Sequence, residues 1–422
     1  MSDASSQRMV TYTARLYPNA AQRARLARWF GASRWCWNYA LERRSKAYRR
    51  RGERVTWTDI SRALTHLKST RRYGWLAQIP ATVIVQKLRD QDRAFKNFFE
   101  GRARYPRFRK RSNAQSVRLQ LRQHHMARRR RWEAGAIDVP GLGEVRFRAG
   151  RHPAAYPKMI TIRQAADGSY HATYMVECAI TPRPAPVRDG VGVDVGLKAL
   201  AVLSSGEVIT NPRHVRQAEQ RRRRAQRALA RKRKGSRRWH AQRRRLARNH
   251  ARVRNARNDY LHKLTRRLID ENQVIAVEDL CVKSLARTAQ ATGVHDAAWG
   301  ELVRQLHYKA EWAGRTVVTV DRYAPTTQLC AACGAQTGPR GVSQLSVRQW
   351  RCKACGAMHN RDHNAAINIL ELGMAQLLPA GSGKVMRVEV GGYSRDDAPA
   401  VPTSEARTRQ SSADRMDRSG ED

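Results

Sequence analysis

Four cysteines near the C-terminal end of the sequence have the spacing of a metal site. They form two CxxC pairs, and 18 residues separate one pair from the other. A CxxC turn presents two sulfurs to one ion, and two such turns at this spacing are typical of a tetrahedral zinc site, whereas a single CxxC is also a redox motif. Because four thiolates leave no open coordination position, the pattern predicts one structural Zn²⁺ held by Cys330, Cys333, Cys352 and Cys355.

Three acidic residues each lie at the edge of an apolar segment. Asp194 lies in the sequence GVDVG, Glu278 in AVEDL and Asp362 in NRDHN. A carboxylate in such a position costs free energy unless it is paired or binds a metal. For any one of them alone, a helix cap or an ion pair with an arginine is the simpler explanation. Three together favour a site in which carboxylates hold two Mg²⁺ ions for the hydrolysis of a phosphodiester.

Other titratable residues lie close to these acids in the sequence. The alternative acids are Asp189, Asp279 and Asp321. Glu278 is preferred over Asp279 because it directly follows a buried apolar run, whereas Asp279 continues into the next loop. The two histidines that flank Asp362, His359 and His363, are interpreted as nucleic-acid contacts or bystanders rather than as metal ligands.

Strands and helices alternate in the part of the chain that must position the acids. Residues 190–210 predict a buried strand, a tight turn at Gly196 and a paired second strand. Residues 274–280 predict a short buried strand, and residues 297–320 predict a helix followed by another strand. The acids therefore belong to one α/β unit.

Arginine dominates about fifty-five residues after Pro212, and Gly235–Ser236 divides them into two predicted helices. Apolar residues recur every seven positions in the second helix, at Trp239, Leu246, Val253 and Tyr260. A charge run is most often a solvated face. Here the apolar seam predicts an ordered helical hairpin at about 214–270, and the density of arginine predicts contact with phosphates.

The N-terminal part combines a strand, helices and then more strands. Residues 9–16 alternate in polarity as a strand does, and helices are predicted from Pro18, from about Thr56 and over Ala81–Glu100. In the third helix the apolar positions are Ile84, Leu88, Phe95 and Phe99, which favour a bundle core over base stacking. From Ser116 the period changes to two, which predicts a small barrel with the helical bundle inserted after its first strand. Tyr105–Arg111 is a basic connector, and prolines mark a boundary near residue 185.

The charge of the chain points to a polyanionic partner. Its 82 Lys and Arg residues against 35 Asp and Glu residues give a net charge of +47, and nucleic acid is the partner that such a charge favours. No apolar run is long enough for a membrane span, and the first ten residues lack a signal-peptide core. The single cysteines Cys36, Cys178 and Cys281 are predicted core residues in a reducing compartment.

Several stretches in order resemble the TnpB family of insertion-sequence proteins. They are GVDVGLKALAVLSSG, VIAVEDLCVKSL, and PTTQLCAACG followed by WRCKACGAMHNRDHNAAINIL. The stretches LYPNAAQ, WNYAL, AFKNFF and YPRFRKR extend the resemblance over about residues 9–375. Members of the family are RNA-guided DNA endonucleases related to compact type V CRISPR nucleases. The resemblance implies a multidomain α+β fold: a split β-barrel (wedge) with an inserted helical recognition bundle, then an RNase H-like (RuvC) α/β nuclease domain interrupted by a four-cysteine zinc module.

These patterns and the resemblance together give expected domain boundaries. The wedge barrel is expected at residues 1–17 and 112–185, the recognition bundle at 18–111, the nuclease domain at 186–325 and 358–378, and the zinc-binding target-nucleic-acid module at 326–357. Residues 379–422 are rich in Gly, Ser and Asp and have no periodicity, so they predict a disordered tail.

Taken position by position, the resemblance places the catalytic, Mg²⁺-binding acids of the family on Asp194, Glu278 and Asp362, with Mn²⁺ as an alternative metal. It places the zinc ligands on the four cysteines of the two CxxC pairs. The chain departs from the family at Asn360, where an acid is frequent, and at Thr326-Thr327, which replaces a double serine and keeps the hydroxyls. No position of the acidic triad is lost.

The resemblance implies a guide RNA from the transposon end, a double-stranded DNA target beside a short motif, and cleavage of both strands at one RuvC-type site. The alternatives are a transposon-associated DNA-binding or regulatory protein, a transposase without guided cleavage, and a general RNA-binding protein. The intact acids argue against a regulatory protein, and charge alone explains neither the acids nor the cysteines. A prokaryotic cytoplasmic location with the nucleoid is expected, with no membrane partner and with a monomer favoured over an oligomer.

Overall fold

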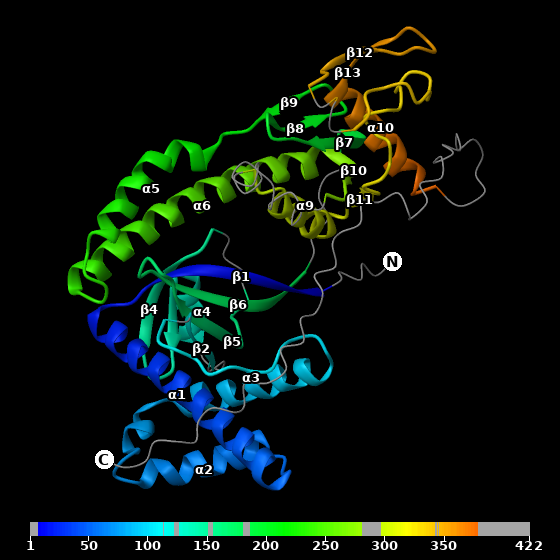
Figure 1. Ribbon diagram of the computed structural model, residues 1–422. Coiled ribbons are helices and arrows are strands. Elements are labelled where there is room, and N and C mark those ends of the chain that lie inside the picture. The colour runs from blue at the N-terminus through cyan, green and yellow to red at the C-terminus, as the bar shows by residue number, and fades with distance from the viewer. Residues whose placement is uncertain are drawn as a thin grey trace, which may run out of the picture.

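The computed structural model describes residues 7–112, 114–121, 126–150, 155–179, 186–280, 297–341, 344 and 346–378. Two separate β-sheets organise these residues, and a third, two-stranded sheet lies near the C-terminal end of the described chain (Figure 1). The predicted disordered tail and Cys281 both lie outside the described residues. In the described part of the chain, no helix is both long enough and apolar enough to cross a membrane.

The N-terminal sheet contains six antiparallel strands in the order β2-β5-β6-β1-β4-β3. Its strands are β1 (Gln7–Tyr17), β2 (Gln115–Gln120), β3 (Ala136–Val139), β4 (Gly143–Arg148), β5 (Met159–Gln164) and β6 (Tyr170–Ala179). The predicted barrel is wrong in its closure, because within the described residues the edge strands β2 and β3 do not pair with each other and the sheet is a half-barrel. Closure depends on strand tilt and register, which the period-two pattern does not report.

Helices pack against this sheet and share its core. Those that contact the sheet are α1 (Ala20–Arg51), α3 (Ala81–Phe99) and α4 (Met126–Glu133), while α2 (Trp57–Ser69) packs against α3 and the short 3₁₀ helix η1 (Gly74–Gln78). One hydrophobic cluster runs from the helices into the sheet, and Leu88, Trp132 and Ile162 are among its fully buried members. The predicted core face of α3 is confirmed for Ile84 and Leu88 but is wrong for Phe99, whose side chain is 73% exposed.

The second sheet has five strands in the order β11-β10-β7-β8-β9. They are β7 (Arg188–Val195), β8 (Ala199–Leu203), β9 (Val208–Thr210), β10 (Asn272–Glu278) and β11 (Thr316–Val320). Strand β10 runs parallel to its two neighbours β7 and β11, while β7, β8 and β9 form an antiparallel meander. The chain order of these strands is the one that the sequence predicts.

Helices cover both faces of the second sheet. The C-terminal part of α6 (Arg237–Glu271) and α9 (Trp299–Ala313) pack against one face, where Val191 and Ile275 lie. Helix α10 (Arg361–Ala375) packs against the other face, where Ile369 meets Ala276. The sheet is therefore the middle layer of a three-layer unit.

The arginine-rich segment forms two helices, α5 (His214–Ala230) and α6, which lie side by side and extend away from the second sheet (Figure 1). Ser236 caps α6, because its hydroxyl accepts a hydrogen bond from the Trp239 backbone N–H. The four residues of the predicted seam are only half-buried, and the buried residues of α6 begin at Leu261. Most of the hairpin therefore exposes basic side chains on several sides.

The cysteine-rich segment is a small unit with little core of its own. Its hairpin consists of β12 (Gln349–Arg351) and β13 (Met358–Asn360), which pair in an antiparallel manner. Buried Trp350 packs beside Cys330 and Cys352. A segment with so few apolar contacts needs another source of stability.

Candidate active site and metal centre

Glycines bring α10 very close to the second sheet. A Cβ atom placed on Gly192 of β7 would lie 1.9 Å from the backbone oxygen of Ala366, and one on Gly373 of α10 would lie 2.6 Å from the Ala276 Cβ. Both distances are shorter than van der Waals contact allows, so these two positions require glycine. The close packing brings the first turn of α10 to the ends of β7 and β10.

Strand alternation directs two of the predicted acids toward α10. In β7, Val191 and Val193 face the side covered by α6 and α9, so Gly192 and Asp194 face α10. In β10, Ala276 contacts α10, so Glu278 lies on the same side two residues later. Because the register pairs Val277 with Val193 on parallel neighbouring strands, the two acids lie at the same end of the sheet.

The Asp194 carboxyl group is half-buried and lies beside other acids. Burial is the largest cause that raises its pKa well above the usual value, and the Glu278 and Asp362 carboxylates raise it further. Burial also raises the pKa of Glu278, while the Thr326 hydroxyl lowers it by donating a hydrogen bond to Glu278 Oε1 at 2.7 Å. The structure thus brings the three predicted catalytic acids within electrostatic reach of one another.

Asp362 lies in the first turn of α10, where the helix terminus favours a negative charge. Asn360 caps this helix, since its side-chain oxygen accepts hydrogen bonds from the backbone N–H groups of Asp362 and His363, each at 3.1 Å. The Arg348 guanidinium donates to both carboxylate oxygens of Asp362 at 3.1 Å. Arg348 precedes β12, so a side chain of the cysteine-rich segment holds this acid.

The acids suit a hard divalent cation by their chemistry. A half-buried carboxylate whose pKa is raised by neighbouring acids, as that of Asp194 is, is stabilised by a cation, and Mg²⁺ prefers oxygen ligands. Within the described residues, however, only the four cysteines have ligand atoms that all lie within 4.8 Å of one another. The acid site is therefore an open set of donors, with Arg348 beside Asp362.

The neighbouring acids and histidines have other contacts. Asp279 pairs with Arg322, and the Asp321 side chain accepts a hydrogen bond from the Tyr323 backbone N–H at 2.7 Å. His363 Nε2 lies 3.1 Å from the Ser204 backbone oxygen. Asp189 is exposed near the start of β7, at the opposite end from Asp194. These residues are separate from the acid site.

The four cysteine sulfurs have the arrangement of a tetrahedral site. Cys330 and Cys355 sulfurs lie 3.6 Å apart, and those of Cys333 and Cys352 lie 3.7 Å apart. A Zn–S bond of about 2.3 Å in a tetrahedron places sulfurs roughly 3.8 Å apart, whereas a disulfide needs about 2 Å. The cluster is therefore one of free thiols that could bind zinc.

Side chains around the cluster approach its sulfurs. The Thr337 hydroxyl donates to Cys352 Sγ at 3.2 Å, and this bond is the largest of several hydrogen bonds that lower the pKa of that thiol to about 6. The pKa values of Cys330 and Cys333 are raised in the same cluster, so Cys352 is the sulfur that most favours the thiolate that a metal binds. His359 Nε2 lies 3.0 Å from Cys330 Sγ. His359, expected as a nucleic-acid contact or a bystander, thus lies against a predicted zinc ligand without belonging to the four-cysteine group.

Two buried asparagines join the cysteine cluster to α10. Asn368 Nδ2 donates to the backbone oxygens of Thr326 and Leu329, at 2.7 and 2.8 Å. Asn364 Nδ2 also donates to Leu329 O, and its Oδ1 accepts from the Ala331 backbone N–H. The first CxxC turn is therefore fastened to the helix that carries Asp362, and Thr326 links it to Glu278.

Comparisons with known proteins give the chain a family. Profiles match it in three places: "Helix-turn-helix domain" of the OrfB/IS605 type at residues 9–53, "Probable transposase" (OrfB/IS605) at 173–289, and "Cas12f1-like, TNB domain" at 299–369. A Streptomyces pristinaespiralis protein named "Putative RNA-guided DNA endonuclease" is 39% identical over 86% of this chain and 88% of its own length. The chain belongs to the OrfB/TnpB family.

Two further relatives of this TnpB-family chain differ in their distance from it. The Escherichia coli protein "Putative RNA-guided DNA endonuclease InsQ" is 31% identical over 88% of this chain and 94% of its own length. A solved Cas12f1–sgRNA–target DNA complex aligns with 86% of this chain and 98% of the matched chain, at 10% identity and a TM-score of 0.44.

Sequence reasoning on this TnpB-family chain missed three polar side chains of the site. Asn364 and Asn368 stand four residues apart on a helix face that is otherwise apolar, a pattern that could have revealed them as buried hydrogen-bond donors. Arg348 is one of 82 cationic residues, and no local pattern distinguishes it from the others.

Proposed function

We propose that this protein is an RNA-guided DNA endonuclease of a transposable element, and that Asp194, Glu278 and Asp362 are its catalytic acids in an RNase H-like (RuvC) domain. The observation that carries the proposal is that Asp194 and Glu278 lie at the same end of one sheet face, with Asp362 of helix α10 close enough to raise the pKa of Asp194. The names of the relatives support the guided activity.

The same three carboxylates are the residues that would hold two Mg²⁺ ions. When bound, Mg²⁺ supplies an activated water and stabilises the leaving oxygen of the phosphodiester. The protein itself partly desolvates Asp194 and Glu278, fixes Glu278 through Thr326, and places Arg348 beside Asp362, where a guanidinium can also neutralise a phosphate. Each DNA strand would reach this single site in turn.

The cysteine cluster would hold one structural Zn²⁺. Its proposed role is to fold residues 326–357 into a target-nucleic-acid module and to keep that module against α10. The four thiolates would fill the coordination of the ion, so no position remains for substrate. The fastening by Asn364 and Asn368 supports this role, because it joins the module to the helix of Asp362.

The remaining domains would bind the nucleic acids. The exposed basic surface of α5 and α6 supports a role in holding RNA and the RNA–DNA heteroduplex by their phosphates. The half-barrel with its helices, at about residues 1–185, would read the short DNA motif beside the target. Base pairing with the guide would read the rest of the sequence.

Cleavage of a defined target tests the proposal. The protein would be purified with the RNA from its own host, that RNA would be sequenced, and a plasmid library with a matching target and randomised flanks would be incubated with Mg²⁺. We expect cut plasmids with one flanking motif for the wild type and none for Asp194→Ala. Equal activity of both proteins, or uncut plasmid with both, would refute the endonuclease.

The products also distinguish the alternatives. A transposase that joins strands would yield new 3′–5′ DNA junctions, whereas the proposed enzyme yields only cut ends with 5′-phosphates. A discrete RNA that ends in element-flanking sequence supports guiding. Bulk RNA without such an end would favour a general RNA-binding protein.

A further inference from the structure

An exposed group of aromatic rings lies where α3 ends and the basic connector begins. Phe95, Phe98, Phe99 and Tyr105 contact one another with ring centroids 5.3–6.3 Å apart. The exposed fraction is 73% for Phe99, 45% for Tyr105 and 58% for the nearby Phe108. Three large rings exposed within ten residues of one another are unusual on a protein surface and indicate a binding function.

Polar contacts with α1 hold the connector in place. Trp37 Nε1 donates a hydrogen bond to Arg107 O at 2.9 Å. The Asn38 side chain accepts from the Arg109 N–H at 2.8 Å and donates to the Arg109 C=O at 3.0 Å. The Ser45 and Tyr105 hydroxyls form a hydrogen bond at 2.9 Å. Pro106 is buried between these anchors. Because the backbone is fixed in this way, the rings lose little conformational freedom when a ligand binds.

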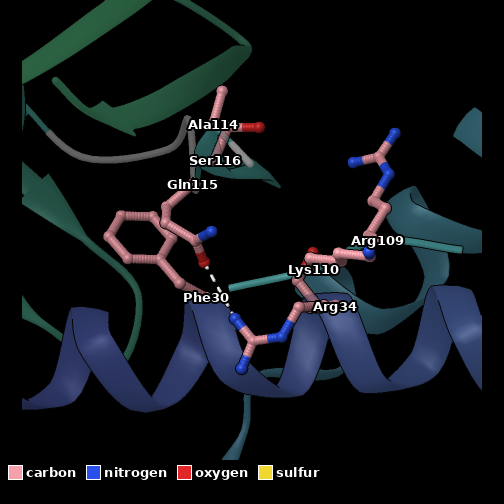
Figure 2. Close-up of a pocket in the computed structure, with 8 residues that line it drawn as sticks. Phe30, Arg34, Arg109, Lys110, Ala114, Gln115 and Ser116 are labelled. Carbon is pink, nitrogen blue, oxygen red and sulfur yellow. Dashed lines mark hydrogen bonds between the residues drawn. The ribbon is translucent and has the colours of Figure 1, made fainter. Parts of the chain in front are cut away.

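The same segment is strongly basic. Residues 102–111 contain six Arg and Lys residues and no acid. The Arg109 guanidinium lies 3.8 Å from the centroid of the Trp37 ring, and burial lowers its pKa, so an anion beside it would be stabilising. Figure 2 shows a hollow next to Arg109. It is lined by Arg109 and Lys110 of the connector, by Phe30 and Arg34 of α1, and by residues 114–116.

We propose that the end of α3 and the connector form a binding platform for unpaired nucleotides. The bases stack on Phe99, Tyr105 and Phe108, and the phosphates lie along the cations of residues 102–111. Exposed ring faces suit bases that are not already stacked in a duplex, and the adjacent cations suit their phosphates. A second copy of this chain would bring like charges together, so charge disfavours it as the occupant. The platform does not depend on whether the carboxylate site cleaves DNA.

Binding of short labelled strands tests the platform. Fluorescence anisotropy would give the affinity of full-length protein, freed of bound nucleic acid, for 12-nucleotide oligo(dT), oligo(rU) and a blunt 12-base-pair duplex. We expect Phe99→Ala/Phe108→Ala to weaken binding of at least one single strand roughly tenfold and to leave duplex binding nearly unchanged. For this aromatic variant, the slope of log affinity against log salt concentration should equal that of the wild type. For Arg104→Gln/Arg107→Gln the slope should be smaller by the amount that corresponds to about two phosphate contacts.

Matched variants separate stacking from other causes. Phe99→Leu/Phe108→Leu keeps apolar bulk but removes the ring faces, so it should weaken binding as the alanine variant does. Tyr323→Ala removes a ring of similar exposure, 77%, outside the half-barrel and its helices and should have little effect. Thermal unfolding at the wild-type temperature would show that the variants are folded.

Photocrosslinking identifies the strand that occupies the platform. Strands of the same lengths that carry 5-iodouracil should crosslink to peptides containing Phe99, Tyr105 or Phe108. Crosslinks from RNA alone point to the guide, and crosslinks from DNA alone point to a displaced target strand. Unchanged affinity of Phe99→Ala/Phe108→Ala for both single strands, or a wild-type dimer that this variant abolishes, overturns the proposal.

Discussion

The two groups of proposed metal-binding side chains in this TnpB-family protein differ in how they are assembled. The four cysteines come from two turns within 26 residues, and their sulfurs lie within 4.8 Å of one another. The three acids come from two strands and a helix spread over 169 residues, and Arg348 lies beside one of them. A closed group of thiols suits a permanent structural ion, whereas an open group of acids leaves room for substrate and for metal exchange.

The largest effect should follow the loss of a cysteine. Cys352→Ser should lower bound zinc from about one per chain to nearly none, because three thiolates and a hydroxyl hold zinc far more weakly. The binding energy of a structural zinc, about 10–16 kcal/mol in small domains, is also folding energy. Elemental analysis would measure the zinc, and limited proteolysis would report unfolding within residues 326–360.

Cys178→Ser is the matched control for this loss. Cys178 is half-buried in the N-terminal sheet, where its sulfur lies 3.6 Å from the Tyr12 hydroxyl. Its replacement should leave zinc at the wild-type level. Full zinc in Cys352→Ser would contradict the four-cysteine site.

The cysteines and the acids also differ in how far their positions could be predicted from the sequence. Each CxxC pair is a local pattern, so the spacing alone identified the four cysteines. Asp194 and Glu278 were recognisable because each one ends an apolar run. Their position opposite Asp362 depends on the close approach of Gly192 to Ala366 and of Gly373 to Ala276, which joins segments far apart in the chain and leaves no periodic trace.

Other parts of the fold could not be predicted for similar reasons. Phe99 continues the apolar spacing of Ile84 and Leu88, but periodicity does not say where the core ends, and its ring lies beyond that end. The half-barrel lacks the closure that alternating strands suggested, because edge pairing is a long-range property. The short helix α4 and strand β3 around buried Trp132 were not predicted.

The next largest effect concerns the charge on Asp194. Asp194→Asn should slow cleavage at least about a thousandfold, since one acid of the proposed metal site is lost. In metal-free protein the same variant should be more stable than the wild type at pH 8. The pKa of Asp194 in the folded protein lies well above its usual value of 3.8. The wild type therefore loses stability as the pH rises from 3.8 through the folded pKa, where the folded carboxyl group gives up its proton.

Thermal unfolding between pH 5 and pH 8 would check this sign. The difference in melting temperature between Asp194→Asn and the wild type should shrink toward pH 5. Addition of Mg²⁺ should then stabilise the wild type more than the variant. A wild type that is more stable than Asp194→Asn at pH 8 without metal would show that the acids do not repel one another.

A smaller effect should follow when the cysteine cluster is separated from α10. Asn368→Ala leaves the backbone oxygen of Thr326 without its buried donor, which costs roughly 1–3 kcal/mol, while Leu329 O keeps its hydrogen bond from Asn364. Hydrogen exchange of the amides at 326–333 should speed up accordingly, while zinc stays bound. Met374→Ala, on an exposed side of the same helix, should leave exchange unchanged. Loss of zinc in Asn368→Ala would mean that the cluster does not hold together on its own.

The smallest effect on stability, and the sharpest test of the open acid site, concerns Arg348. Its ion pair with Asp362 is partly exposed, so Arg348→Gln should change stability by less than about 1 kcal/mol. Removal of the guanidinium leaves Asp362 free for a metal, and the Mg²⁺ concentration for half-maximal thermal stabilisation should fall a few-fold. Arg351→Gln, exposed in the neighbouring strand β12, should leave that concentration unchanged. If both variants behave like the wild type, the pair with Arg348 does not compete with metal, and the acid site is as preformed as the cysteine cluster.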